Sequence, residues 1–111
     1  MRLDKQMRGA VTVISMDGRL DSSTAPGVQA ELAELLPEEG LVLLDLSRVA
    51  YMSSAGLRVL LLVYRQTQRT GARVALTGLP PDVRAVMAAT GFLDFFAVVD
   101  TVDDGLQELT A

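Results

Sequence analysis

The chain has 111 residues, half of them apolar and 5% aromatic, and a formal net charge of −4. Cys and His are absent and Lys5 is the only lysine, which excludes disulfides, thiolate or imidazole metal sites, and most nucleophilic catalysis. The acidic balance disfavours direct nucleic-acid binding, and no apolar run approaches the roughly 20 residues of a membrane span. We therefore expect one cytoplasmic domain over residues 1–111 that is not an enzyme, has no cofactor or metal and does not insert into a membrane.

A β-hairpin is predicted at the start of the chain. Residues 11–16 (VTVISM) are rich in β-branched side chains and precede Asp17-Gly18, a pattern typical of a strand that ends in a turn. Residues 3–7 are expected to pair with this strand across Arg8-Gly9. The hairpin would add an antiparallel edge to any sheet that follows.

The first helix is predicted to begin at Thr24-Ala25-Pro26. This triplet combines a hydroxyl cap with Pro in the first turn, where its missing N–H costs nothing. The apolar stripe of the helix consists of Val28, Leu32, Leu35 and Leu36, and Pro37 is expected to end it.

The rest of the chain alternates strands and helices. Residues 41–46 (LVLLDL) form an almost continuous apolar run, typical of a central strand covered on both faces. A helical pattern runs from Ser54 to Thr70 and ends at Gly71. The remaining segments are a strand at 73–77, a helix from Pro80-Pro81-Asp82 to Thr90-Gly91, a strand at 95–99 and a helix at 102–109.

This order predicts an α/β fold. We expect a mixed, mostly parallel sheet of about four to five strands with an N-terminal antiparallel hairpin and about four helices. Functional residues in such sheets gather beyond the carboxyl ends of the strands. Here those ends lead into residues 18–24, 47–54 and 78–82.

The helix that begins at Ser54 has a polar outer stripe. At about 100° per residue, one arc holds Ser54, Arg58, Arg65 and Arg69. The opposite side is expected to face the sheet through Leu57, Leu60, Val63, Tyr64 and Thr67. Leu61 and Leu62 border the stripe, and apolar side chains in that position are candidate partner contacts. The arginines form either a solvated face or a surface for an acidic partner.

Two interpretations fit the pair Ser53-Ser54. In the first, one serine simply caps the helix, a role for which Ser is preferred. In the second, Ser53 caps the helix while Ser54, exposed in the first turn, accepts a phosphoryl group. A phosphate there would be stabilised by free backbone N–H groups and by the helix dipole.

Three segments carry a family resemblance. Residues 49–60 (VAYMSSAGLRVL) resemble the signature of the STAS family (sulfate transporter and anti-sigma factor antagonist), in which a hydrophobic pair precedes Asp or Ser, a phosphorylatable Ser, a small residue, Gly and Leu. Residues 18–24 (GRLDSST) resemble the family's loop after the second strand, and residues 87–109 resemble its C-terminal pattern. The similarity therefore covers nearly the whole chain in the right order.

The resemblance implies a single STAS domain that acts as an anti-sigma factor antagonist. Unphosphorylated, such a protein binds an anti-sigma factor that is also a serine kinase. Phosphorylation of the serine at the helix start dissociates the complex, and a serine phosphatase reverses the modification. Carried onto this sequence, the acceptor is Ser54, and the partner-binding residues are Asp21, Ser22, Ser53, Ser54, Gly56, Arg58 and Leu61.

Three alternatives accompany this interpretation. Ser53 stands where the best-known members have Asp, so either of two adjacent hydroxyls is a possible acceptor, with Ser54 favoured by its alignment. A STAS domain also occurs as an accessory subunit of membrane transporters, such as lipid-trafficking complexes. Finally, residues 41–49 resemble the strand of a receiver domain, with Asp45 as phosphate acceptor, but the acidic pair and lysine that a receiver needs are absent.

Overall fold

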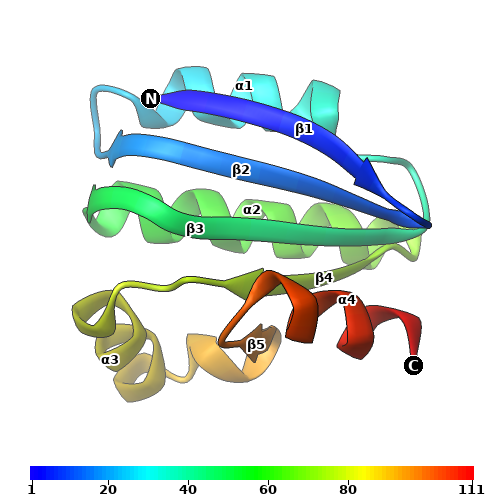
Figure 1. Cartoon of the computed structure of the whole chain (residues 1–111). Coiled ribbons are helices and arrows are strands. Elements are labelled where there is room, and N and C mark those ends of the chain that lie inside the picture. The colour runs from blue at the N-terminus through cyan, green and yellow to red at the C-terminus, as the bar shows by residue number, and fades with distance from the viewer.

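A computed structural model describes all 111 residues of the chain. Its elements are shown in Figure 1. In chain order they are β1 (Arg2–Arg8), β2 (Val11–Leu20), α1 (Ala25–Leu35), β3 (Leu41–Met52), α2 (Ser54–Thr70), β4 (Arg73–Thr77), α3 (Pro81–Thr90), the 3₁₀ helix η1 (Phe92–Phe95), β5 (Ala97–Val99) and α4 (Val102–Thr110).

The five strands form one sheet whose spatial order follows the chain, β1-β2-β3-β4-β5. β1 and β2 are antiparallel and form the expected hairpin, with Arg8 opposite Val11. The other neighbouring strands are parallel. The predicted fold class is therefore confirmed, and the apolar run 41–46 lies in the central strand as expected (Figure 1).

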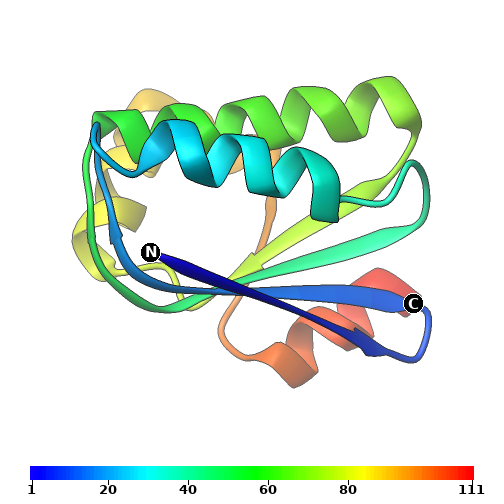
Figure 2. The same cartoon turned by 90° about the horizontal axis from the view of Figure 1, so that it is seen from above.

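Helices cover the two faces of this sheet unequally (Figure 2). α1 and α2 lie side by side on one face, over the larger core of 19 buried residues, which includes Ile14, Leu44 and Leu60. α4 covers β3, β4 and β5 on the other face, above a smaller core that includes Leu43 and Leu109. None of the helices combines the length and the apolar character needed to cross a bilayer.

The two long parallel strands extend beyond their predicted ends. The prediction that β2 stops at Asp17-Gly18 is wrong, because β2 stays paired with β3 up to Leu20 opposite Met52. The pairing register shifts between Ser15 and Asp17 and again after Gly18, whose φ of +124° favours glycine. β3 likewise continues to Met52 and is not a loop after residue 46. Both strands thereby reach the start of α2.

The observed helix boundaries agree more closely with the predicted ones than the strand boundaries do. α2 spans Ser54–Thr70 and ends at Gly71, which adopts the left-handed conformation with φ +81°. The last strand is shorter than predicted, since residues 92–95 form η1 and only Ala97–Val99 pair with β4.

Candidate functional site

Ser53 caps the N-terminus of α2. Its backbone is extended, with φ −89° and ψ −178°, and its hydroxyl accepts a hydrogen bond from the Ala55 N–H at 3.2 Å. Its carbonyl oxygen accepts hydrogen bonds from the N–H groups of Gly56 and Leu57. Ser53 thus satisfies two of the backbone donors that a helix start leaves free, those of Ala55 and Gly56, and accepts the first regular helical hydrogen bond from Leu57, which is the cap role assigned to it from the sequence.

Ser54 is the first residue of α2 and is exposed to solvent. Its hydroxyl makes no hydrogen bond within the chain, and its backbone N–H has no backbone acceptor. The first turn of α2 contains no acidic residue. A negative group added to this hydroxyl would therefore meet the positive end of the helix dipole without local repulsion from the helix itself.

The end of β2 holds the start of α2 in place. The N–H of Ser53 donates to the Leu20 carbonyl oxygen at 3.0 Å. Gly56, one turn into the helix, lies so close to the strand ends that a Cβ atom there would stand 2.5 Å from Met52 Cγ and 3.0 Å from the Leu20 carbonyl oxygen. Gly56 is buried and lets the helix approach the sheet; its contact with a partner stays a prediction.

Asp21 organises the loop between β2 and α1. Its carboxylate accepts hydrogen bonds from the Ser23 hydroxyl at 2.6 Å, the Ser23 N–H at 3.0 Å and the Thr24 N–H at 3.2 Å, and the Arg19 guanidinium lies 3.6 Å away. The hydrogen bond from the Ser23 hydroxyl is the main reason why the pKa of Asp21 is lowered from its ordinary value. Asp21 is therefore an anion beside the α2 start, and Ser22 is exposed next to it.

Thr24 does not cap α1 as predicted. Its hydroxyl donates to the Arg19 carbonyl oxygen at 2.8 Å and accepts from the Asp21 N–H at 3.0 Å, so it closes the loop. No helix N–H donates to it. The carbonyl oxygen of Asp21 accepts from the Ala25 N–H at 2.8 Å instead. The proline in the first turn of α1 and the end of the helix near Leu36 agree with the boundaries predicted from the sequence.

Arg19 and Tyr51 form a contact that the sequence reading missed. The two residues are paired across β2 and β3, and the Arg19 guanidinium lies 4.6 Å from the centre of the Tyr51 ring, within the range of a cation–π interaction. Tyr51 is 45% exposed. The contact forms only because β2 and β3 stay paired beyond Asp17 and residue 46, where the sequence predicts that both strands end. No local pattern around Arg19 or Tyr51 indicates this pairing.

The outer face of α2 is basic and partly apolar. Arg58, Arg65 and Arg69 are exposed, Leu61 and Leu62 are half-buried, and α2 contains no Asp or Glu. None of the three arginines belongs to an ion pair; the chain's ion pairs involve Arg2, Arg19, Arg48 and Arg84. Three uncompensated positive charges thus follow Ser54 along one face of the helix.

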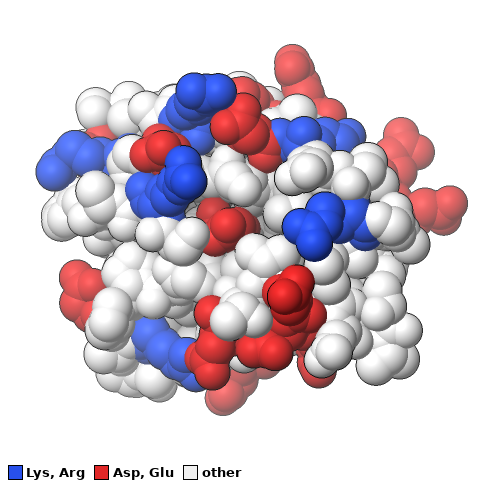
Figure 3. Space-filling model, viewed as in Figure 1, with Lys and Arg blue, Asp and Glu red and all other residues white.

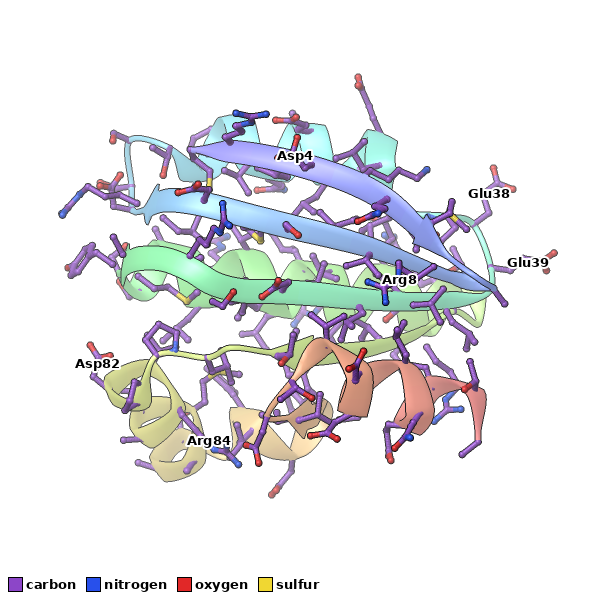
Figure 4. The ribbon with its side chains drawn as sticks, in the orientation of Figure 1. Asp4, Arg8, Glu38, Glu39, Asp82 and Arg84 are labelled. Atoms are coloured by element: carbon purple, nitrogen blue, oxygen red, sulfur yellow. The ribbon has the colours of Figure 1, made fainter.

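The opposite face of the molecule has a different character. Acidic and basic side chains are intermixed there, and acidic ones gather near the start of α4 (Figure 3). Asp45 shares this face, because it alternates with the core residue Leu44 on β3, so it lies across the sheet from α2. Figure 4 shows Glu38 and Glu39 projecting from the loop before β3, at the end of the sheet away from the α2 N-terminus. No group of three or more acidic side chains is placed to hold a metal ion.

Together these features define a small α/β domain in which an exposed serine, next to an anionic loop, heads a basic helix face. The profile of the STAS domain family matches residues 2–105. The chain belongs to the STAS domain family, as its sequence motifs suggested.

The chain is similar over most of its length to several named proteins. It is 37% identical over 102 residues to BtrV of Bordetella bronchiseptica, a protein described as an anti-sigma factor antagonist, with 91% of this chain and 88% of that protein covered. It is 31% identical over 86 residues to the anti-sigma-B factor antagonist of Listeria monocytogenes, with 77% and 75% covered.

Solved structures confirm the fold. A Thermotoga maritima protein described as an anti-sigma factor antagonist superposes with a TM-score of 0.89 at 17% identity, over 98% of this chain and 95% of that one. Part of the murine anion transporter Slc26a9 superposes with a TM-score of 0.80 at 14% identity, over 95% of this chain but 18% of the transporter.

Proposed function

We propose that this protein is an anti-sigma factor antagonist that is switched by phosphorylation of Ser54. In the unphosphorylated form it binds an anti-sigma factor that is also a serine kinase, which releases a sigma factor for transcription. The observation that carries the proposal is the exposed, unbonded hydroxyl of Ser54 at the first position of α2. The names of the relatives at 37% and 31% identity support the general role.

The chemistry of the switch is a phosphoryl transfer. The Ser54 Oγ attacks the γ-phosphorus of ATP bound to the kinase, a new O–P bond forms, the bond to the ADP oxygen breaks and ADP leaves, while the hydroxyl proton passes to a base of the kinase or to water. A serine phosphatase restores the hydroxyl by hydrolysis. Ser54 is favoured over Ser53 because the Ser53 hydroxyl is half-buried and is occupied with the Ala55 N–H.

The proposed partner surface consists of residues around this serine, of which Ser22, Ser54 and Arg58 are exposed and Asp21, Ser53 and Leu61 are half-buried. Phosphorylation adds about −1.5 to −2 charges at the centre of this surface. That charge would have to be desolvated in the complex beside the anionic Asp21 loop. A penalty of about 3–4 kcal/mol, typical of like charges at an interface, corresponds to a loss of affinity of roughly 100- to 1,000-fold.

The helix itself should tolerate the phosphate. The free Ser54 N–H and the absence of acidic residues in the first turn of α2 favour a negative group there. The switch would thus act on the surface that docks, with the fold unchanged.

Phosphorylation by purified anti-sigma factor kinases of the source organism tests the proposal. We expect ATP and the correct kinase to phosphorylate the wild-type chain and Ser53→Ala, but not Ser54→Ala, as read by mass spectrometry of the peptide that contains residues 53–58. Phosphate on Ser54→Ala and none on Ser53→Ala would move the acceptor to Ser53. No phosphorylation by any such kinase would refute the proposal.

The alternative function, an accessory subunit of a membrane transporter, has a narrower basis. The similarity to the anion transporter concerns the fold alone, at 14% identity. A binding measurement distinguishes the two functions. A transporter subunit should bind a permease or its ATPase, and its affinity should be the same whether or not Ser54 is phosphorylated.

A further inference from the structure

An exposed aromatic ring lies beside the proposed partner surface. Phe95 of η1 is 45% exposed, one of the few large apolar side chains with such exposure. Its ring nevertheless stacks on the ring of Tyr64 from α2, with centroids 5.0 Å apart and planes 15° apart. Tyr64 in turn meets the buried Phe96 edge-on at 5.6 Å. Phe95 is therefore held in position by the core while one side of its ring faces solvent.

This ring continues an apolar strip along α2. Leu57, Leu61 and Tyr64 are half-buried and follow one another at helical spacing on one flank of the helix. Tyr64 is ten residues beyond Ser54, which corresponds to about 15 Å along the helix axis. A stable interface covers about 800 Å² on each partner, so a protein docked over Ser54 along this face reaches Phe95.

The charge along the same face indicates what kind of partner fits. Arg58, Arg65 and Arg69 border the strip without ion-pair partners, although the chain as a whole carries a net charge of −4. Apolar contacts at the centre of an interface with arginines at its rim match a partner segment that carries apolar side chains flanked by carboxylates.

We infer that Phe95, stacked on Tyr64, is an anchor of the partner interface, and that it receives an acidic, apolar segment of the anti-sigma factor. The inference rests on the proposed function and extends its surface from the start of α2 to η1. Aromatic side chains often anchor an interface, and one that is held rigidly before binding loses little conformational freedom when it is covered.

Calorimetric titration of the purified anti-sigma factor kinase with matched variants tests this inference. Phe95→Ser should weaken binding roughly tenfold or more, whereas Val86→Ser, at a side chain that is 47% exposed on α3, should stay within about twofold of wild type. Phe95→Tyr keeps the ring and should bind nearly as wild type. Arg65→Glu should slow association and flatten its dependence on salt.

A second measurement does not depend on any variant folding correctly. Hydrogen exchange of residues 92–96 in the wild-type chain should slow when the kinase is bound. Unchanged exchange there, or equal affinity of Phe95→Ser and wild type, would overturn the anchor. So would a change of the isolated chain from dimer to monomer in Phe95→Ser during sedimentation, since a second copy would then be the occupant.

The same titration separates this inference from the proposed function. If Ser54→Asp loses binding while Phe95→Ser does not, only the anchor is wrong. If Ser54→Asp binds as wild type, the phosphorylation switch fails whatever Phe95 does. Absence of binding to every anti-sigma factor kinase refutes both.

Discussion

Replacing Gly56 with alanine tests how α2 is held against the sheet. The added methyl group would stand 2.5 Å from Met52 Cγ, 2.9 Å from Leu20 Cγ and 3.0 Å from the Leu20 carbonyl oxygen. Overpacking of this kind costs about 1–3 kcal/mol, and the better helix propensity of alanine returns about 1 kcal/mol. Since one of the three contacts is with backbone, we expect a net loss of about 1–2 kcal/mol in the free energy of unfolding.

Gly27 provides a matched control within a second helix. It lies in the first turn of α1, where a Cβ atom would meet nothing within 4 Å. Gly27→Ala therefore gains helix propensity without a clash and should stabilise the protein by about 0.5–1 kcal/mol.

Urea unfolding of the two variants measures both effects. The midpoints should move in opposite directions with unchanged slopes, because neither substitution alters the surface exposed on unfolding. Gly56→Ala should also lower the rate of Ser54 phosphorylation, since the clash lifts the start of α2 from the end of β2. A Gly56→Ala variant as stable as Gly27→Ala would show that the close approach of α2 to the strands is not a constraint.

Three further predictions concern the same end of the sheet. Ser53→Ala removes the helix cap and should destabilise the protein by about 1 kcal/mol in thermal unfolding, while mass spectrometry still finds phosphate on Ser54. A Ser53→Ala variant that is fully stable but is not phosphorylated would show that Ser53 is the acceptor and not the cap. Ser54→Asp should raise stability by about 0.3–1 kcal/mol through the helix dipole and yet weaken partner binding, so a destabilised variant would contradict the dipole argument. Because the folded-state pKa of Asp21 lies below its ordinary 3.8, its carboxylate stabilises the fold above that pH. In urea unfolding, wild type should therefore be more stable than Asp21→Ala near neutrality, and this difference in stability should disappear as the pH falls below 3.8. A difference that grows on acidification would be inconsistent with the loop hydrogen bonds.

The sequence predicts α2 well because its boundaries are set by local chemistry. Ser53 supplies a hydroxyl cap and Gly71 supplies the left-handed residue that ends the helix, and both act within a few residues. The alternation of apolar strands with amphipathic helices likewise fixes the order of elements and the parallel sheet.

The strand ends depend on pairing between distant residues and could not be predicted in this way. Residues 47–52 are mostly polar or exposed and show no clean alternation, but they pair with residues 17–20 after a shift in register. The Asp17-Gly18 pair, usually a turn signal, serves as an irregularity within a continuous strand. The Arg19–Tyr51 contact was missed for the same reason.

Some features of the candidate site follow from local sequence pattern, and others depend on packing between distant residues. The exposure of Ser54 and Arg58 follows from helical periodicity, whereas the burial of Gly56 follows from how closely α2 meets Leu20 and Met52. The sequence predicts Phe95 as the first residue of a strand, but it lies in η1, and its stacking on Tyr64 places it at the flank of α2.

The central claim is that phosphorylation of Ser54 controls partner binding. The most direct test compares the affinity of the unphosphorylated and phosphorylated forms for the anti-sigma factor kinase. The chain should be prepared unphosphorylated and stoichiometrically phosphorylated on Ser54, and each form titrated into the same anti-sigma factor kinase. The account predicts tight binding of the first form and an affinity at least about 100-fold lower for the second. Equal dissociation constants for the two forms would contradict it.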